Sequence, residues 1–185
     1  MPRHKFHFVL NGSVRLKLAT HTANMVDLDK SSYTIVVIFV SRKKLCYFYM
    51  RKIEFLCVHC TATPQSTTVE SIQRHWRERL GWKSPGYHKI VKANGEVITL
   101  AKDEQICNGV AGFNSVSLHV SYIGGIDSRG NPVDNRTQGQ RDALSQVLHA
   151  WRAKYPNAKI QGHCDFPKVN KACPSFDAKA EYAHI

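Results

Sequence analysis

The sequence predicts an α/β fold in which a mixed central β-sheet is flanked by helices. Short apolar runs typical of buried strands alternate with segments whose apolar residues recur with helical period. Two helical segments begin with the spacing of a capping box, and an Asn-Gly pair between two apolar runs indicates a hairpin. A hairpin among alternating strands and helices implies a sheet with both parallel and antiparallel strands.

The first elements are expected between residues 53 and 81. Residues 53–60 (IEFLCVHC) form an apolar run of strand length. Thr67 and Glu70 have capping-box spacing and begin a helix that Gly81 ends. The apolar face of this helix is expected to comprise Val69, Ile72, Trp76 and Leu80.

The remaining elements follow at short intervals. In chain order, we expect a hairpin of residues 87–92 and 96–100 around Asn94 and Gly95, a strand over 116–123, a helix from Thr137 through Trp151, a short strand over 159–161 and a terminal helix over 175–184. With 185 residues and 43% hydrophobic content, the chain can form one packed domain of ordinary size.

The first 49 residues differ from the rest and predict an N-terminal extension ahead of a single domain at residues 50–185. They hold 8 basic against 2 acidic residues, have no clear amphipathic period and contain one isolated apolar run, YTIVVIFV, at 33–40. Two interpretations stay open. Either translation naturally starts at Met50 and the earlier residues are not part of the native product, or the extension is ordinary and adds one strand at 33–40. The lack of pattern is also compatible with a disordered extension.

The formal charge of +12 favours acidic partners, which include nucleic acid, an anionic membrane surface and an anionic wall polymer. No RNA-binding aromatic motif or zinc-finger helix accompanies the charge, so no nucleic-acid partner is expected. The run at 33–40 is far shorter than the roughly 20 residues that span a bilayer, so no transmembrane segment is expected. The start of the chain contains no clear signal peptide, and the six cysteines are expected to be mostly reduced.

Two histidines and a cysteine have the residue types and positions of a catalytic metal centre. His59 lies late in the first predicted strand, while His163 and Cys173 lie ten residues apart in an irregular, proline-containing loop. Imidazole and thiolate are good zinc ligands, and three protein ligands leave the fourth tetrahedral position open to water. Because a lone histidine at a strand end is more often structural, the assignment of His59 depends on the other two residues.

A second pattern offers a rival metal site. Cys57 and Cys60 form a C-x-x-C pair, which elsewhere indicates a structural zinc or a redox site. Strand alternation places Cys57 and His59 on one face and Cys60 on the other, which argues against both uses. Cys57 stays open as a rival metal ligand.

Four motifs in matching order resemble the zinc-dependent N-acetylmuramoyl-L-alanine amidases, a family that includes the phage-lysozyme-type amidase and the peptidoglycan recognition proteins. The motifs are FLCVHCTAT, GWKSPGYHKIVKANGEV, YIGGID and KACPSFD, and the resemblance covers roughly residues 52 to 180. It implies a hydrolase in which a zinc-activated water cuts the amide between N-acetylmuramic acid and the L-alanine of peptidoglycan.

Carried over onto this sequence, the family pattern implies one Zn2+ per chain, held by His59 of V-H-C-[ST]-A-T, His163 of G-H-x-D and Cys173 before the Pro-Ser turn. It also implies that Tyr87 of G-Y-H supports catalysis by hydrogen-bonding the water or the reacting carbonyl. It also implies that Lys171 stabilises the charge on the carbonyl oxygen. From the residues alone, a packing role for Tyr87 and a solvated charge for Lys171 would be favoured, and no general base is identified.

Three features depart from the family pattern. Val110 stands where many members carry a histidine that contacts substrate, and His119 replaces a usual glycine. The loop from His163 to Lys171 is slightly longer than in the phage enzyme. These departures concern the substrate groove rather than the three ligand residues.

The resemblance implies a biological role and leaves an alternative. The chain suits a monomeric phage or prophage endolysin that accumulates in the cytoplasm and acts on the cell wall after release, and it also suits a wall-recycling enzyme. The alternative is a non-catalytic peptidoglycan-binding receptor of the same fold. Retention of all three ligand residues disfavours the receptor.

Overall fold

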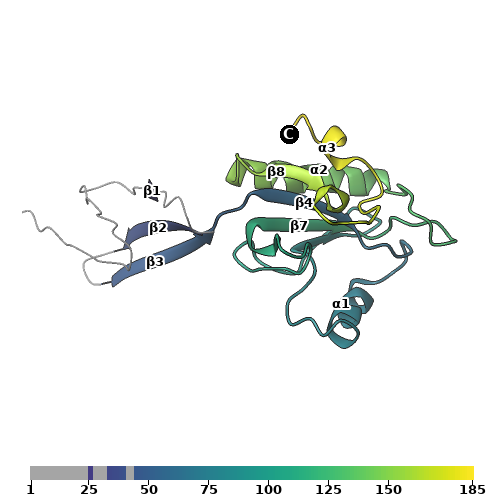
Figure 1. The fold of residues 1–185 in the computed structure, drawn as a ribbon, viewed down its shortest axis with the longest axis horizontal. Helices are drawn as coiled ribbons and strands as arrows, with labels where there is room; N and C mark the ends of the chain where they lie inside the picture. The colour runs from purple at the N-terminus through teal and green to yellow at the C-terminus, as the bar shows by residue number, and fades with distance from the viewer. Residues whose placement is uncertain (1–24, 27–32, 41–43) are drawn as a thin grey trace, which may run out of the picture. The chain divides into compact units, whose positions relative to one another are not determined.

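The computed structural model describes residues 25–26, 33–40 and 44–185, with side chains from Arg51 onward. The chain divides into two compact units, Met1–Met50 and Arg51–Ile185 (Figure 1). The rest of the predicted extension lies outside the described residues.

Three strands make up the described part of the first unit. They are β1 (Met25–Val26), β2 (Tyr33–Val40) and β3 (Lys44–Arg51), in the sheet order β1-β2-β3, and β1 pairs antiparallel with β2. β2 coincides with the strand expected at 33–40. Whether residues 1–49 belong to the native product stays a prediction.

The second unit contains a five-stranded sheet in the order β6-β5-β7-β4-β8. β4 (Phe55–Cys60) runs parallel to both of its neighbours, β7 (Ser117–Tyr122) and β8 (Lys159–Gly162). β5 (Lys89–Val91) runs parallel to β7, and β6 (Val97–Thr99) pairs antiparallel with β5. The predicted mixed sheet is therefore confirmed, and the predicted hairpin supplies its antiparallel edge.

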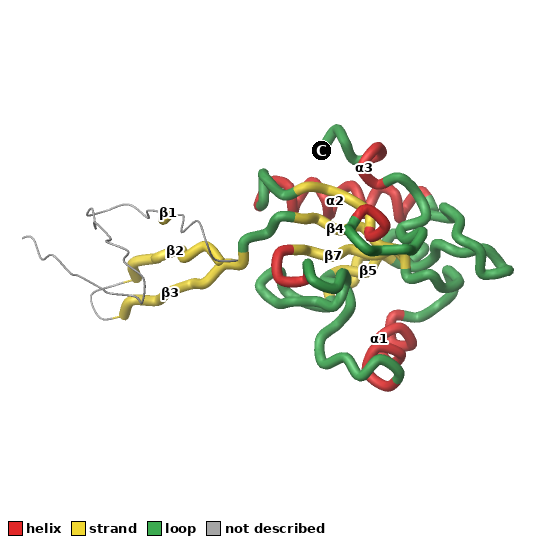
Figure 2. The backbone as a smooth tube through the Cα atoms, viewed as in Figure 1, coloured by secondary structure: helices red, strands yellow, loops and turns green. Residues whose placement is uncertain are grey.

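Helix α2 (Gln138–Lys154) covers one face of this sheet (Figure 2). The predicted capping box forms, because the Thr137 hydroxyl accepts from the Gln140 backbone N–H and the Gln140 side chain accepts from the Thr137 backbone N–H, each at 3.1 Å. The apolar side of α2 packs on alternate residues of β4 and β7. The residues of this core include Leu56, Val58, Leu118, Val120, Leu144, Val147, Leu148 and Trp151.

Helix α1 (Val69–Glu78) covers the opposite face. Its buried residues form a second cluster with Ile90 of β5 and with Ile123, which follows β7. These two isoleucines alternate along the chain with Val91 and Tyr122, which belong to the α2 core. Because successive side chains of a strand point to opposite faces, the sheet is covered on both sides.

The boundaries of α1 differ from the prediction. Thr68 rather than Thr67 caps the helix, and its hydroxyl accepts a hydrogen bond from the Ser71 backbone N–H at 3.2 Å. The helix ends before Leu80, which is 45% exposed, so the prediction that Leu80 lies on the buried face is wrong. Gly81, with a φ of 66°, turns the chain away at this point.

The predicted terminal helix over 175–184 is also wrong in extent, because only α3 (Ala178–Glu181) forms. Ser175 has a φ of 70°, in the left-handed region, which a right-handed helix cannot include. The helix instead begins after Asp177, whose carboxylate accepts from the Ala180 backbone N–H at 2.9 Å.

Two 3-10 helices complete the described elements: η1 (Asn114–Val116) precedes β7, and η2 (His163–Asp165) follows β8. Within the part of the chain that the structure describes, no helix is both long and apolar enough to cross a membrane.

Candidate active site

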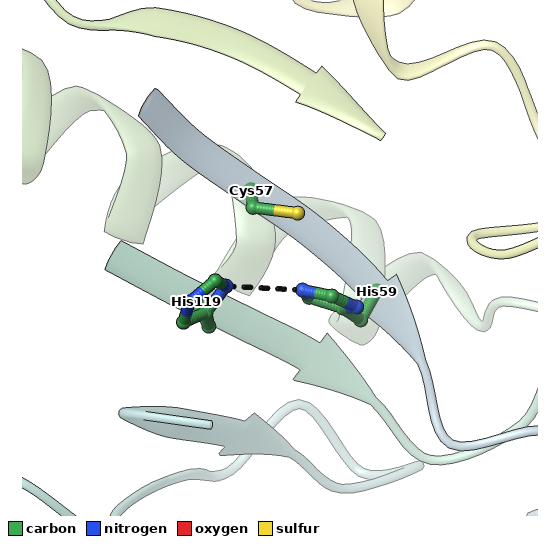
Figure 3. A group of neighbouring side chains, drawn as sticks. All are labelled: Cys57, His59 and His119. Atoms are coloured by element: carbon green, nitrogen blue, oxygen red, sulfur yellow. Dashed lines mark hydrogen bonds between the residues drawn. The ribbon is translucent and has the colours of Figure 1, made fainter. Parts of the chain in front are cut away.

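The site side chains of β4 point away from α2. Leu56 and Val58 belong to the α2 core, so the alternate residues Cys57 and His59 face the other side of the sheet (Figure 3). Both are buried with 0% exposure. The prediction from strand alternation that Cys57 and His59 share a face is confirmed.

The three predicted metal ligands converge at the carboxyl ends of β4 and β8. These parallel strands place Val58 opposite Gly162, so the residues that follow, His59 of β4 and His163 at the start of η2, emerge side by side. Their ring centroids lie 4.8 Å apart. The loop that follows brings Cys173 Sγ to 3.7 Å from His59 Nδ1.

The spacing of these residues fits a tetrahedral metal. The donor atoms of His59, His163 and Cys173 all lie within 4.8 Å of one another. Zinc bonds of about 2.0 Å to nitrogen and 2.3 Å to sulfur, at a tetrahedral angle, separate the two donors by about 3.5 Å. The observed separation of His59 Nδ1 and Cys173 Sγ is 3.7 Å. Because His163 and Cys173 are only partly buried, solvent reaches the open side of the group.

Burial and neighbouring charge keep both imidazoles neutral. Desolvation lowers the pKa of His59 well below 6.5, and the neighbouring His119 and His163 lower it further. Desolvation, followed by the positive charge of Lys171, lowers the pKa of His163 to about 4. The neutral imidazole is the form that binds a metal, so both rings are ready for coordination at neutral pH.

Cys173 is held against the backbone of β4. The Cys60 backbone N–H donates to Cys173 Sγ at 3.2 Å. A side-chain hydrogen bond with Cys60 and burial both raise the pKa of the Cys173 thiol. Because a coordinated metal deprotonates its thiol ligand, metal binding here would release a proton.

The two predicted catalytic residues lie beside this group. The Tyr87 ring centroid lies 4.9 Å from that of His59. Trp76 of α1 packs edge-on against the Tyr87 ring, with the two centroids 5.3 Å apart. Burial raises the pKa of Tyr87, so the phenol stays protonated at neutral pH. Lys171 is exposed, and its charge is near enough to lower the pKa of both His59 and His163.

Sequence reasoning treated His119 only as a departure from a pattern, yet His119 contacts one of the predicted ligands. β7 lies beside β4 with His119 opposite Cys57, and His119 Nδ1 is 3.2 Å from His59 Nε2 (Figure 3). Cys57, His59 and His119 form a second group whose donor atoms lie within 4.8 Å of one another. Cys57 thus lies near His59 but belongs to this second group. The pairing of two strands far apart in the sequence creates the contact, and no local sequence signal predicts it.

Val110, the other single residue that departs from the family pattern, is a packing residue. Its side chain is 1% exposed and clusters with Cys57 and Phe166. Its backbone N–H donates to Asn114 Oδ1 at 2.7 Å. The side chain at this position therefore lies within the core rather than on a substrate surface.

Two histidines and a cysteine at the carboxyl edge of a mixed sheet, with one side open to solvent, define a candidate metal-dependent hydrolase. A family model described as N-acetylmuramoyl-L-alanine amidase matches residues 49–176. The endolysin of Enterobacteria phage K11 is 42% identical over 121 residues, which cover 65% of this chain and 79% of that relative.

Solved structures share the fold of this chain. The Ph2119 endolysin from Thermus scotoductus bacteriophage Ph2119 has 25% identity and a TM-score of 0.61, over 84% of this chain and 90% of that one. Bumblebee PGRP-SA, at 15% identity, shares the fold with a TM-score of 0.60, over 84% of this chain and 89% of that one. The chain therefore belongs to the N-acetylmuramoyl-L-alanine amidase family. It is an amidase of peptidoglycan, and the predicted fold class and enzymatic function are confirmed.

Proposed function

We propose that His59, His163 and Cys173 hold one Zn2+ per chain and that this ion serves the hydrolysis. The observation that carries the proposal is the convergence of their donor atoms within 4.8 Å of one another. The two imidazoles are neutral at physiological pH, since the pKa of each is lowered. When bound there, zinc supplies a Lewis acid and lowers the pKa of coordinated water toward neutrality.

The substrate carbonyl in this proposal is the lactyl carbonyl of N-acetylmuramic acid, to which L-alanine is attached. Tyr87 holds the reacting water or this carbonyl by donating a hydrogen bond. Because the pKa of Tyr87 is raised by burial, its phenol acts as a donor and not as a base at neutral pH. The position of its ring, 4.9 Å from that of His59 between centroids, supports this reach.

Lys171 stabilises the negative charge that develops on the carbonyl oxygen. Its ammonium charge already acts on the pKa of His59 and His163, which supports a place within range of the reaction. Fixed charge stabilisation of this kind contributes about 3 kcal/mol to the transition state. The exposure of Lys171 leaves its side chain free to follow an incoming substrate.

We also propose that the chain is an endolysin of a phage or prophage, as its relative from phage K11 is named. In this role a monomer accumulates in the cytoplasm, reaches the wall after release, and has peptidoglycan rather than nucleic acid as its partner. Cells that express the chain should lyse only after their inner membrane is permeabilised. Lysis without permeabilisation would contradict cytoplasmic accumulation, and light scattering of the purified chain tests the monomer.

The catalytic unit in this proposal is residues 50–185, and residues 1–49 are dispensable for catalysis. A chain that begins at Met50 should hydrolyse peptidoglycan as fast as the full chain. Mass spectrometry of the native protein tests the natural start, since peptides from before Met50 would exclude a start there.

Metal content and turnover together test the zinc site. Wild type should contain one zinc per chain, and His163→Ala should lose both the zinc and the turnover. His149→Ala is a matched control, because His149 is an exposed histidine of α2 and its removal should leave both unchanged. A zinc-loaded wild type that binds peptidoglycan without hydrolysing it would support the receptor instead. A folded wild type that takes up no zinc would contradict the ligand assignment.

A further inference from the structure

We propose that His119 is a positioning residue for the metal centre: its Nδ1 accepts a hydrogen bond from the His59 Nε2–H and so turns His59 Nδ1 toward the metal. The inference rests on the zinc site proposed above. His119 acts through His59 and does not itself touch the substrate in this account.

The two ring nitrogens of His59 face different partners. Nδ1 lies 3.7 Å from Cys173 Sγ, on the side of the proposed metal, and Nε2 lies 3.2 Å from Nδ1 of His119 (Figure 3). A neutral imidazole carries one proton, so a ring that gives its Nδ1 lone pair to a metal holds that proton on Nε2. His119 Nδ1 is then the acceptor. Histidine ligands generally donate their second N–H to a group that fixes the ring, and His119 takes that place here.

A contact with His88, the residue before β5, holds His119 in this position. The His119 backbone N–H donates to His88 Nδ1 at 3.0 Å. His88 Nδ1 is therefore an acceptor, and the His88 Nε2–H donates to the Gln105 carbonyl oxygen at 3.0 Å. With this proton on Nε2, the 3.3 Å approach of Arg51 Nη2 to the same nitrogen is a packing contact and not a hydrogen bond. The proton positions required on His59, His119 and His88 are mutually consistent.

The imidazole of His119 has little room to turn. It is buried with 0% exposure, and the His88 ring stacks against it with centroids 5.7 Å apart. Gly109 lies against the ring, and a Cβ at that position would stand 2.5 Å from His119 Cγ and 2.7 Å from Cε1. Such enclosure fixes the acceptor, and through it the orientation of His59.

His119 also carries a polar atom that packing alone does not explain. With Nδ1 accepting from His59, the His119 proton lies on Nε2, which is buried and has no hydrogen-bond partner among the described residues. A buried N–H without a partner costs free energy, so a purely structural role would favour an apolar residue. A histidine at this position is better explained by the acceptor at its other nitrogen.

The alternative to a hydrogen bond between His59 and His119 is a second metal bound by Cys57, His59 and His119. The donor atoms of these three residues also lie within 4.8 Å of one another. Such a metal would bind His59 through Nε2, while the proposed zinc binds Nδ1. A neutral imidazole has one free lone pair, so it cannot bind two metals without losing its remaining proton. All three side chains are also fully buried, which disfavours an added cation.

Two substitutions of similar size separate the hydrogen bond from packing. In His119→Asn the amide oxygen can replace Nδ1 as the acceptor, whereas His119→Leu keeps a comparable volume without an acceptor. Zinc affinity of the full-length chain is measured by competition with a chromophoric chelator. We expect the leucine variant to bind zinc about 10- to 100-fold more weakly and the asparagine variant to stay within about threefold of wild type. Nitrogen-15 spectra of zinc-loaded wild type should place the protons of both His59 and His119 on Nε2.

The outcomes distinguish a failure of the proposed role of His119 from a failure of the zinc site on which it rests. Equal zinc affinity in wild type and His119→Leu, with His163→Ala weakened, would overturn the role of His119 alone. Unchanged affinity in His163→Ala would overturn the zinc site and this inference with it. A proton on His119 Nδ1 in zinc-loaded wild type would also overturn the inference, whether or not the variants fold. Two zinc ions per chain, one of them lost in Cys57→Ala, would assign these residues to a second metal.

Discussion

Replacing Gly109 by alanine is expected to destabilise the protein by forcing a methyl group against His119. The added Cβ would lie 2.5 Å from Cγ and 2.7 Å from Cε1 of the imidazole, and nearer still to Nδ1. Carbon atoms in contact normally stay about 3.5–4.0 Å apart. The ring cannot swing away easily, because the His119 side chain is fully buried.

The magnitude follows from two opposing effects. Overpacking a closed core costs about 1–3 kcal/mol. Gly109 does not have a positive φ, so alanine fits its backbone and restricts the unfolded chain, which stabilises by about 0.4–1 kcal/mol. The net loss should therefore lie between about 0 and 2.6 kcal/mol in the free energy of unfolding, measured by urea titration of the metal-free protein.

A double-mutant cycle with His119→Ala isolates the cause. Without the ring, the alanine methyl at position 109 has space, so Gly109→Ala should become neutral or stabilising by up to about 1 kcal/mol. The two substitutions should therefore couple strongly. If Gly109→Ala cost the same free energy in both backgrounds, the close approach to His119 would not be its cause and the reasoning would be refuted.

Three further predictions concern catalysis and pH. Lys171→Ala should lower kcat about 10²- to 10³-fold, because it removes a fixed charge from the carbonyl oxygen, while zinc content stays at wild type; full turnover would contradict its role. Tyr87→Phe should lower kcat about 10²-fold with little change in fold, because it removes one hydrogen-bond donor, and an unchanged kcat would assign Tyr87 to packing. The metal-free protein should lose stability as pH falls from 6.5 to 4. Burial lowers the pKa of His88 to about 4, so between those values the unfolded state binds more protons than the folded state. The loss for this group approaches about 3 kcal/mol, and urea titrations with a constant free energy of unfolding across this range would contradict it.

Periodicity and turn chemistry predicted the sheet and its two main helices. The alternation of Leu56, Cys57, Val58 and His59 was sufficient to place Cys57 and His59 on one face. Helix ends were less predictable because neighbouring residues compete for the same role. Thr67 and Thr68 can both cap α1, and the structure uses Thr68.

The candidate ligands were predicted by their motifs, while their supporting contacts were not. His59 and His163 meet because β4 and β8 are paired in parallel, and the sequence does not state that pairing. His119 lies beside His59 because β7 is the other neighbour of β4. Such contacts depend on the register of strands 60 or more residues apart, which local propensity does not encode.

The central claim is tested most directly by the release of new L-alanine amino termini from purified peptidoglycan. The full-length chain is assayed as prepared, after treatment with a chelator, and after zinc is restored. We predict release that the chelator abolishes and zinc restores, with no new reducing sugar ends. Release that is insensitive to the chelator, or cleavage that produces reducing ends, would contradict the assignment of a zinc amidase.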